Sequence, residues 1–294
     1  MNYSFLIPHK NSPQLLSRCL ASIPQRDDLE VIVVDDNSEC KAAVREIVNK
    51  FCRAVYYENK GYGAGGARNT ALQHAKGRWL VFSDADDYFV PNFLDVLDNY
   101  LDADVDIVYH PALAVDSESL VPRSNLLHKF NTYINEYNGD KYTTDQIKYR
   151  MNSPWWKIVR REFVLKYNIN FEEVPKGNDV LFTFQVGYFS KKILVNKSPI
   201  YVHTYNANGI SFGKKTLKIR MSSLAQVYKV NHFYGFINHP EWKRNILFYF
   251  FEIIKYDGMK MFIMTLLSFI ANYRIIKKVK NHYVDAILDI QNKL

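Results

Sequence analysis

Cysteine is scarce in this chain of 294 residues, which contains only Cys19, Cys40 and Cys52. These three form no C-x-x-C pair and no Cys/His spacing of the kind that binds a metal ion. Neither a disulfide framework nor a zinc site is therefore supported. We expect a reducing, cytoplasmic location.

Long apolar runs are also absent. The first residues, MNYSFLIPHKN, contain no basic region, and their apolar stretch is too short for a signal peptide. No stretch reaches the ~20 apolar residues that a membrane-spanning helix needs. Export and transmembrane insertion are therefore not expected. The content of 48% hydrophobic and 23% charged residues is that of a folded globular protein.

Acidic residues are sparse in one part of the chain. The net charge of +8 arises in residues 211–294, which hold 14 Lys and Arg against 5 Asp and Glu, whereas residues 1–210 hold 24 against 25. A basic segment can bind nucleic acid, but this one is also rich in Phe, Ile, Leu, Met and Tyr. That mixture favours an anionic lipid surface over nucleic acid. We therefore place a division near residue 210.

Short β-branched or aromatic runs alternate with segments whose apolar residues recur at helical spacing. The expected strands are residues 3–8, 30–34, 54–58, 78–83 and 105–109. The expected helices between them are residues 13–23, 41–52, 66–76 and 91–101. This alternation predicts a parallel α/β sheet. The later segments are predicted to be irregular over residues 110–153, α+β over 154–205 and helical from 216 onward.

Functional side chains are expected where these strands end, because open α/β sheets bind ligands beyond the carboxyl ends of their strands. The segments at the ends of the first four strands are residues 7–11, 35–38, 59–69 and 83–87. Carboxylates, glycines and Arg68 should therefore meet at one edge of the sheet.

Asp84 and Asp86 are spaced so that both side chains lie on the same side of an extended segment. This spacing suits Mg²⁺ or Mn²⁺ bound to a diphosphate, since these ions take one or two protein oxygens and keep positions for water and phosphate. Acidic residues after a strand also cap helices, as Asp87 or Asn92 could do here. Both interpretations stay open.

Asp35 and Asp36 are ambiguous in the same way. Asp, Asn and Ser are ordinary turn formers, and a turn explains the segment 35–38 by itself. A carboxylate at this place could instead accept the imide N–H of a uracil or thymine ring.

The glycine-rich segment 61–66 fits the G-x-G-x-x-G pattern of dinucleotide-binding folds. Two features count against that interpretation. The pattern follows the third expected strand and not the first, and the acids downstream form a close pair instead of one ribose-binding residue. An oxidoreductase with a nucleotide cofactor stays a minor alternative.

Together these motifs resemble the inverting family 2 glycosyltransferases with a GT-A fold, a group that includes bacterial capsule, exopolysaccharide and lipopolysaccharide sugar transferases. The segments that carry the resemblance, in the family's order and spacing, are residues 4–11, 30–38, 59–69 and 79–87. A weaker likeness continues through residues 153–164, which look like the family's acceptor-side segment. Residues 177–182 look like its Glu-Asp catalytic motif, with Asn178 in place of the usual Glu.

The resemblance implies a role for each matching residue. The nucleotide-sugar site would consist of Pro8, Asp35, Asp36, Arg68, Asp84 and Asp86. Asp84 and Asp86 would also hold Mn²⁺ or Mg²⁺, with His203 as a further metal or phosphate contact, although a lone histidine after a strand is more often structural. Asp179 matches the position of the general base, and Trp155 and Trp156 lie on the acceptor side.

The predicted function is that of a metal-dependent hexosyltransferase of bacterial surface polysaccharide synthesis. It would move a sugar with inversion from a nucleotide-diphosphate sugar, UDP-linked, to a saccharide or lipid-linked glycan. Residues 1–210 would form the GT-A domain, with a nucleotide-sugar half (1–110) and an acceptor half (111–210), followed by the helical region 211–294. A non-catalytic saccharide-binding or scaffold protein is the other alternative, because Asn178 departs from the family pattern and because Trp155 and Trp156 are aromatic.

The helical C-terminal region has two interpretations, of which the first is an anionic membrane surface bound through residues 243–294, where nine Lys and Arg stand against four Asp and Glu. Residues 259–270 are almost uninterrupted apolar side chains before the basic run 274–280. Such a helix can lie in the headgroup region at the inner face of the cell membrane. Alternatively, these helices pack on the α/β domain or on a second subunit of a homodimer, and the lysines are simply solvated.

Overall fold

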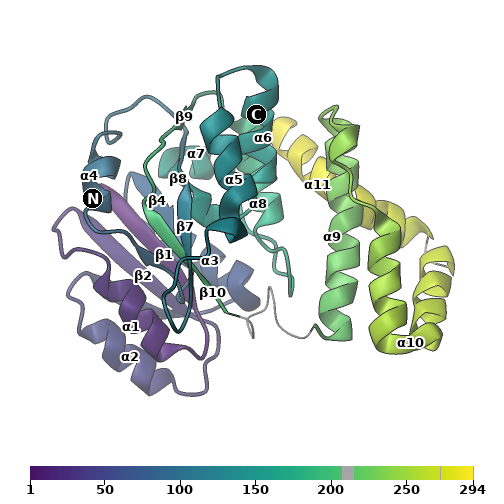
Figure 1. Ribbon diagram of the computed structural model, residues 1–294, viewed down its shortest axis with the longest axis horizontal. Helices are drawn as coiled ribbons and strands as arrows, with labels where there is room; N and C mark the ends of the chain where they lie inside the picture. The colour runs from purple at the N-terminus through teal and green to yellow at the C-terminus, as the bar shows by residue number, and fades with distance from the viewer. Residues whose placement is uncertain (207–214, 272, 294) are drawn as a thin grey trace. The chain divides into compact units, whose positions relative to one another are not determined.

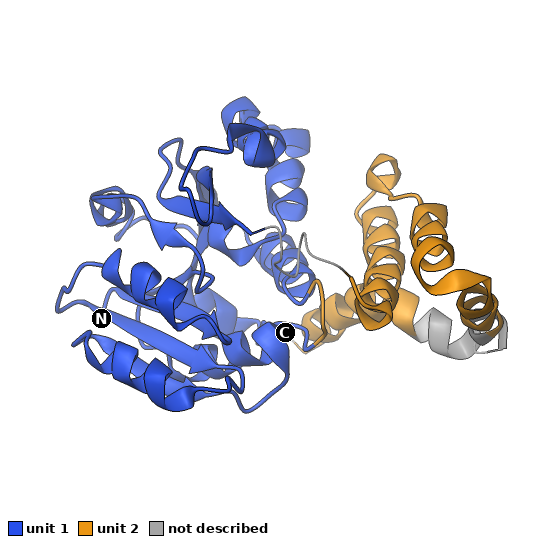
Figure 2. Cartoon of the chain, turned by 60° about the horizontal axis from the view of Figure 1, so that its bottom comes forward, with its two compact units in different colours: residues 1–173, 178–209 blue, residues 174–177, 210–294 orange. Residues whose placement is uncertain are grey.

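The computed structural model describes residues 1–206, 215–271 and 273–293 (Figure 1). The chain divides into two compact units (Figure 2). Residues 1–173 and 178–209 form one, called the N-terminal unit, and residues 174–177 and 210–294 form the other, called the C-terminal unit. The division expected near residue 210 lies outside the described residues.

A seven-stranded sheet forms the centre of the N-terminal unit (Figure 1). Its strands, in spatial order, are β3 (Ala54–Glu58), β2 (Leu29–Asp35), β1 (Tyr3–His9), β4 (Trp79–Phe82), β8 (Lys157–Arg160), β6 (Ile107–Tyr109) and β9 (Ile193–Val195). Neighbours run parallel except at β8, which is antiparallel to β4 and β6. Every residue of β1 and β4 is buried, as in parallel strands covered on both faces. The predicted, mainly parallel α/β sheet is confirmed.

The strand order reverses once, between β1 and β4. The chain moves outward from β1 through β2 to β3 and then crosses back to β4, on the other side of β1. Because such crossovers are right-handed, helices α1 (Pro13–Ala21) and α2 (Lys41–Asn49) cover one face of the sheet, and α3 (Gly63–His74) covers the other. The carboxyl ends of β1 and β4 therefore mark the topological switch point, beyond which open α/β sheets bind ligands.

Helix α1 shows how the sequence specifies these elements. Pro13 occupies the first helical turn, where its missing N–H is not needed. Leu16, Cys19 and Leu20 recur at helical spacing and are buried. The burial of Cys19 agrees with its role as a small apolar residue and not as a disulfide partner.

The prediction that residues 110–153 are irregular is wrong. They contain β7 (Ala112–Asp116), α5 (Ser124–Glu136) and α6 (Lys141–Arg150). Helix α6 is capped by Asp140, whose carboxylate accepts a hydrogen bond of 2.7 Å from the backbone N–H of Thr143. The polar composition obscured this helix because its buried face is narrow.

The helix expected over residues 91–101 is shorter. The structure has α4 (Phe93–Asp98), and neither Asp87 nor Asn92 caps it through its side chain. Asn92 instead adopts a left-handed conformation, with φ of 58°, that turns the chain into the helix. The capping explanation for Asp87 is therefore excluded, and this buried carboxylate needs another explanation.

The expected α+β segment 154–205 is present and builds a second, smaller sheet. It contains η1 (Pro154–Trp156), β8, α7 (Arg161–Lys166), α8 (Val180–Phe189), β9 and β10 (Tyr201–Tyr205). In the three-stranded sheet, β10 lies between β5 (Tyr88–Phe89) and β7. β10 is parallel to β7 and antiparallel to β5. Strand β10 therefore runs beside the segment that follows β4.

The C-terminal unit is helical, as predicted. It contains α9 (Leu217–Phe236), η2 (Pro240–Trp242), α10 (Ile246–Ala271) and α11 (Tyr273–Gln291). Helix α10 is broken at Gly258, where φ is 86°. The core of the unit is formed by Leu224, Val227, Phe233, Tyr283 and Ile287. Across the described ranges, no helix combines the length and the apolar content that crossing a membrane requires.

Candidate active site

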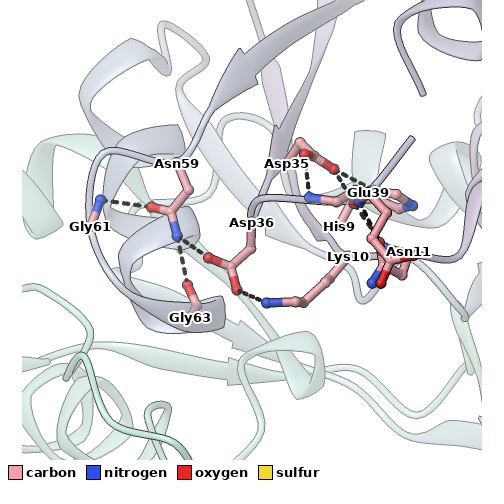
Figure 3. A network of polar contacts seen from close by, with 10 residues as sticks. His9, Lys10, Asn11, Asp35, Asp36, Glu39, Asn59, Gly61 and Gly63 are labelled. Carbon is pink, nitrogen blue, oxygen red and sulfur yellow. Dashed lines mark hydrogen bonds and ion pairs between the residues drawn. The ribbon is translucent and has the colours of Figure 1, made fainter. Parts of the chain in front are cut away.

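The carboxyl ends of β1, β2 and β3 lie side by side, with His9 paired to Asp35 and Asp35 paired to Glu58 in register. The polar residues that follow these strands form a connected network (Figure 3). The predicted convergence of strand-end segments on one edge is therefore what the structure shows. Individual carboxylates in this network have different environments.

Asp35 is fully buried and serves the network internally. Its carboxylate accepts hydrogen bonds from the backbone N–H of Ser38 at 2.9 Å and from His9 Nδ1 at 2.9 Å. His9 Nε2 accepts from the backbone N–H of Ser12, so Nδ1 carries the proton. Burial alone would raise the pKa of Asp35, but the hydrogen bonds from Ser38 and His9 outweigh it, and the pKa is lowered. Asp35 is thus an ionised turn residue whose hydrogen bonds hold the loop of residues 35–38 in place.

Asp36 points out of the same loop and keeps some exposure. One oxygen accepts from Asn59 Nδ2 at 2.7 Å, and the other is 3.4 Å from Lys10 Nζ. Asn59 also binds the backbone of Gly61 and Gly63 (Figure 3). Asp36 therefore joins three strand ends and, unlike Asp35, presents an edge to solvent.

Arg68 lies on α3 and links the end of β4 to the start of α8. Its Nη2 donates to Asp84 Oδ1 at 2.5 Å, and its Nη1 donates to Asn178 Oδ1 at 2.7 Å. The guanidinium also lies over the ring of Phe171. The side chain is buried, so the pairing with Asp84 offsets the cost of burying its charge.

Asp86 lies two residues after Asp84, in the segment that follows β4. Among the residues that the structure describes, it forms no ion pair. Burial, and then the charges of Asp87 and Asp84, raise the pKa of Asp86 to about 7. A divalent cation would relieve this repulsion, and carboxylate oxygens are ligands that Mg²⁺ and Mn²⁺ accept. The residues present therefore fit such an ion. The expectation of an extended segment is wrong, because residues 84–87 form a turn in which the backbone N–H of Asp87 donates to the C=O of Asp84 at 3.1 Å.

The protein would supply only part of the coordination shell. Within the described residues, no group of three or more His, Cys, Asp or Glu side chains is arranged to hold a metal ion. One or two carboxylates with substrate phosphates and water would complete the shell of Mg²⁺ or Mn²⁺. The geometry thus suits an ion that binds together with a phosphorylated ligand.

Asp87 and His203 form a structural pair. The buried carboxylate of Asp87 accepts from Tyr201 Oη at 2.7 Å, from the backbone N–H of Thr204 at 2.6 Å and from His203 Nδ1 at 3.1 Å. Burial disfavours the charged imidazole, but the hydrogen bond to Asp87 and nearby carboxylates raise the pKa of His203. These contacts give His203 a structural partner and explain why Asp87 is buried: it attaches β10 to the segment after β4.

The two predicted acceptor-side tryptophans are buried. Trp155 is 6% exposed and Trp156 is 1% exposed. Trp155 stacks on Tyr201 at 5.1 Å and on His203 at 5.3 Å between ring centroids. Both indoles therefore pack beneath the site, and neither presents an open ring face to a sugar.

Asp179 caps the N-terminus of α8 by position, although its side chain makes no capping hydrogen bond. The surrounding protein raises the pKa of Asp179 through burial, while the positive charges of Arg68 and Lys157 act in the opposite direction. A carboxylate in such a balance can exchange a proton. Arg68 connects it to Asp84 through Asn178, so Asp179 belongs to the same site.

Lys157 is a site-associated residue that the sequence analysis missed. It is 1% exposed, and its Nζ donates to the backbone C=O of Met151 at 2.8 Å and to Thr183 Oγ1 at 3.2 Å. The sequence does contain a signal for this residue, because Lys157 lies between the apolar residues Trp156 and Ile158. A single charged residue inside an apolar run can be a buried charge.

The glycines of segment 61–66 serve close packing. A Cβ at Gly65 would lie 2.2 Å from the backbone oxygen of Glu172, and one at Gly66 would lie 2.8 Å from the backbone carbon of Gly61. Helix α3 can approach these backbones only where it has no side chain. This explains the pattern without a dinucleotide.

Comparisons with known proteins agree with this geometry. The glycosyl transferase family 2 profile matches residues 4–167, more than half of the chain. A Campylobacter jejuni protein, named GalNAc(5)-diNAcBac-PP-undecaprenol beta-1,3-glucosyltransferase, is 24% identical over 71% of this chain and 67% of its own. The Staphylococcus aureus poly(ribitol-phosphate) beta-N-acetylglucosaminyltransferase TarS is 26% identical over 71% of this chain and 36% of its own.

Solved structures share the fold. TarS 1–349 in complex with UDP-GlcNAc aligns with a TM-score of 0.61 and 20% identity, over 97% of this chain and 72% of that one. A Pyrobaculum calidifontis mannosyltransferase in complex with GDP-Man and Mn²⁺ aligns with a TM-score of 0.57 and 15% identity, over 98% and 86%. The predicted GT-A fold is confirmed. The chain spans 62% of the curated Bacillus subtilis relative EpsH.

We predict that Gly65→Ala destabilises the protein, although alanine normally stabilises a helix interior. The added Cβ must displace the backbone at Glu172, which costs about 1–3 kcal/mol for overpacking. Urea denaturation measures this change, with Ala64→Ser as the control in the same helix. A Gly65→Ala variant as stable as the parent would show that the close approach is not required.

We also predict opposite effects for two neighbouring carboxylates. Asp87→Ala leaves the hydroxyl of Tyr201 and the N–H of Thr204 without an acceptor, at a cost of about 1–3 kcal/mol for each buried group. Asp86→Ala removes an unpaired charge and should leave the melting temperature of the metal-free protein unchanged or higher. Equal losses in both variants would contradict this division into structural and ligand-facing acids.

Proposed function

The chain belongs to glycosyl transferase family 2, and from this premise we propose that it transfers one sugar from a UDP-linked donor to a saccharide or lipid-linked glycan, with inversion at the anomeric carbon. The observation that carries the proposal is the edge at the switch point. There Asp36, Arg68 and the pair Asp84 and Asp86 follow successive strands of a nucleotide-binding fold.

The donor nucleotide would lie across the ends of β1 and β2. Pro8 supplies backbone beside the base, and Asp36 accepts the imide N–H of uracil through its exposed edge. Asp35, with its oxygens already bonded to His9 and Ser38, supports this loop from below. Arg68 holds Asp84 in place next to the ribose and fixes the pocket wall.

The diphosphate would lie next to Asp86. We propose that Asp86, with Asp84, holds Mn²⁺ or Mg²⁺, and His203 keeps its place through Asp87. The ion, when bound, supplies a Lewis acid that neutralises the departing diphosphate. The missing counter-charge at Asp86 supports this assignment, as does the neighbouring fold bound to GDP-Man and Mn²⁺.

Asp179 would act as the general base. The acceptor hydroxyl loses its proton to the Asp179 carboxylate as its oxygen attacks the anomeric carbon, while the bond from that carbon to the diphosphate oxygen breaks on the opposite face. Inversion follows from this single displacement. The replacement of the family's Glu by Asn178 leaves the proposed base in place, because the base is Asp179. Asn178 has another role, since its Oδ1 accepts a hydrogen bond from Arg68.

The relatives suggest the acceptor class. The names of the Campylobacter protein and of TarS both specify acceptors that carry phosphate, one on a polyprenol and one in a polymer. We propose an acceptor of this kind, met at the inner face of the cell membrane in the cytoplasm. Residues 1–210 would form the catalytic domain, with 1–110 for the donor and 111–210 for the acceptor, and residues 211–294 would form an accessory region.

The C-terminal helices carry the proposed membrane contact. Helix α10 exposes Leu247, Phe248 and Phe251, the last at 70% exposure, and beyond Gly258 it exposes further Met, Ile and Leu side chains. Lys255 and Lys260 are exposed residues of the same helix. The side chains of residues 268–278, with most of the basic run 274–280, lie outside the described residues. Packing on a second subunit of a homodimer is the alternative partner for this face.

We predict that Asp86→Ala abolishes metal-dependent donor binding, because the cation loses its protein ligand. Calorimetric titration of UDP with and without Mn²⁺ makes the measurement. Asp102→Ala, an exposed acid elsewhere in the same unit, is the control and should bind as the parent does. Unchanged affinity and metal dependence in Asp86→Ala would remove the metal assignment.

We predict that Asp179→Asn keeps donor affinity within a few-fold but lowers kcat by ~10²–10⁴, since the amide cannot take the proton. Glu173→Gln is the comparison, because Glu173 instead accepts a hydrogen bond from the backbone N–H of Tyr62 and should not act as a base. Near-normal turnover of Asp179→Asn would place the base elsewhere.

We predict that the full chain sediments with anionic vesicles at low salt and is released at high salt, because each Lys or Arg near the surface adds about 1 kcal/mol. The double variant Phe248→Ser, Phe251→Ser should lose most of this binding, whereas Leu165→Ser should not. If the parent chain stays in the supernatant, the proposed membrane contact is wrong. The exposed apolar face of α10 would then be tested for self-association of the chain.

A further inference from the structure

One face of α9 lines a groove in the C-terminal unit. Tyr228, Asn231, His232, Gly235 and Phe236 recur at helical spacing, so they lie in one stripe along the helix. Lys243, Ile246 and Lys280, from the segment before α10, from α10 and from α11, form the other walls. The groove has a volume of about 540 Å³, which is within the range of small-ligand sites.

The groove concentrates positive charge. Neither Lys243 nor Lys280 forms an ion pair with any residue that the structure describes. The Nζ atom of Lys243 lies 3.4 Å from the place that a Cβ on Gly235 would occupy, so its ammonium rests against the groove wall. Burial, and then the charges of Lys280 and Lys243, lower the pKa of His232. Among the described residues, Asp285 acts on His232 in the opposite direction.

The remaining walls are apolar. Tyr228, Phe236 and Ile246 flank the cations. Ile246 begins α10, whose exposed apolar side chains start with Leu247 and Phe248. Two ammonium groups that line one groove and form no ion pair with a described residue call for an anion, and the apolar walls favour one that carries an organic part.

We infer that this groove binds a phosphate or diphosphate group of the acceptor, with the apolar walls contacting the part attached to it. This inference rests on the proposed glycosyltransferase function, because a sugar transferase needs to bind an acceptor. The binding chemistry comes from Lys243 and Lys280 as donors, with Asn231 and His232 beside them.

The test uses the full chain with the donor site filled by saturating UDP and Mn²⁺, so that the probes report only a second site. Farnesyl diphosphate, inorganic pyrophosphate and farnesol are titrated by calorimetry. Farnesyl diphosphate should bind, and the double variant Lys243→Ala, Lys280→Ala should bind it about tenfold or more weakly. The control is Lys197→Ala, Lys293→Ala, which removes the same charge at two exposed lysines outside the groove.

The probes separate the two sources of phosphate. Tighter binding of farnesyl diphosphate than of pyrophosphate assigns the groove to a lipid headgroup, and equal binding assigns it to phosphate alone. Equal losses in both double variants, or no binding of either phosphate, overturn the inference. Donor hydrolysis by the groove variants should stay at the parent level, so failure here is distinct from failure of the proposed function.

A separate observation in the N-terminal unit concerns Lys157. A fully buried lysine is costly, and an apolar residue of similar length would fill the same space. Its Nζ instead joins the backbone at Met151 to Thr183, and Thr183 Oγ1 donates to the backbone C=O of Asn152. Thr183 lies one turn after Asp179, and its N–H donates to the Asp179 C=O at 3.0 Å.

We infer that Lys157 is a positioning residue for Asp179: through Thr183 it fixes the first turn of α8, which begins directly after Asp179. The other charged groups acting on Asp179 are Arg68 from α3 and Asp84 from the end of β4. Arg68 is already paired to Asp84. Burial lowers the pKa of Lys157 to about 7, so Lys157 carries its positive charge in the acidic range, where it acts on Asp179.

The pH profile of kcat/KM distinguishes this role from packing. In Lys157→Met the acidic limb should move to higher pH, because loss of the positive charge disfavours ionised Asp179. Thr183→Val, which removes a hydrogen bond but no charge, should lower kcat without moving the limb. If Lys157→Met does not fold, Lys157→Gln keeps a donor and makes the same test. An unmoved limb in the charge-removing variant overturns the inference, whereas Asp179→Asn should abolish the limb.

Discussion

The guanidinium of Arg68 organises the polar edge of the N-terminal unit. It joins Asp84, at the end of β4, to Asn178, at the start of α8, two segments that are far apart in the sequence. Without it, Asp84 would face Asp86 and Asp87 with no fixed cation, and Asn178 would lose its hydrogen-bonded link to the end of β4. The position of Asn178 relative to Asp84 therefore depends on this buried side chain.

This contact also explains the departure at Asn178. Three carboxylates already lie close together after β4, and their repulsion is visible in the raised pKa of Asp86. A glutamate at position 178 would add a further negative charge around Arg68. The neutral amide of Asn178 accepts a hydrogen bond from Arg68 without adding that charge, so the ion pair of Arg68 is with Asp84. Asp179 is then the one carboxylate of the two neighbouring positions 178 and 179.

The carboxylates of the edge divide according to their partners. Asp35 and Asp87 are buried and fully bonded to groups of the protein, and they hold loops and strands together. Asp36 and Asp86 keep an unsatisfied edge or charge, and these are the two that a ligand would complete. Sequence position alone does not separate the two classes, since Asp35 is adjacent to Asp36 and Asp86 is adjacent to Asp87.

The edge itself could be predicted because it follows from local patterns: parallel strands must end together, and residues 35–38 and 83–87 directly follow strands. The contacts across the fold could not. His203 meets Asp87, and Lys157 meets Thr183, only after strands distant in the sequence pair. Helix α6 was missed because its cap at Asp140 and its narrow buried face give a weak apolar pattern.

The most direct test of the account is a thermal-shift titration of the full chain with nucleotide sugars and with NAD, each with and without Mn²⁺. A ligand that binds only the folded state raises the melting temperature by mass action. The account predicts that at least one UDP-sugar stabilises the protein, that Mn²⁺ increases the shift and that NAD does not stabilise it. Stabilisation by NAD, or no shift with any nucleotide sugar in the presence of Mn²⁺, would contradict it.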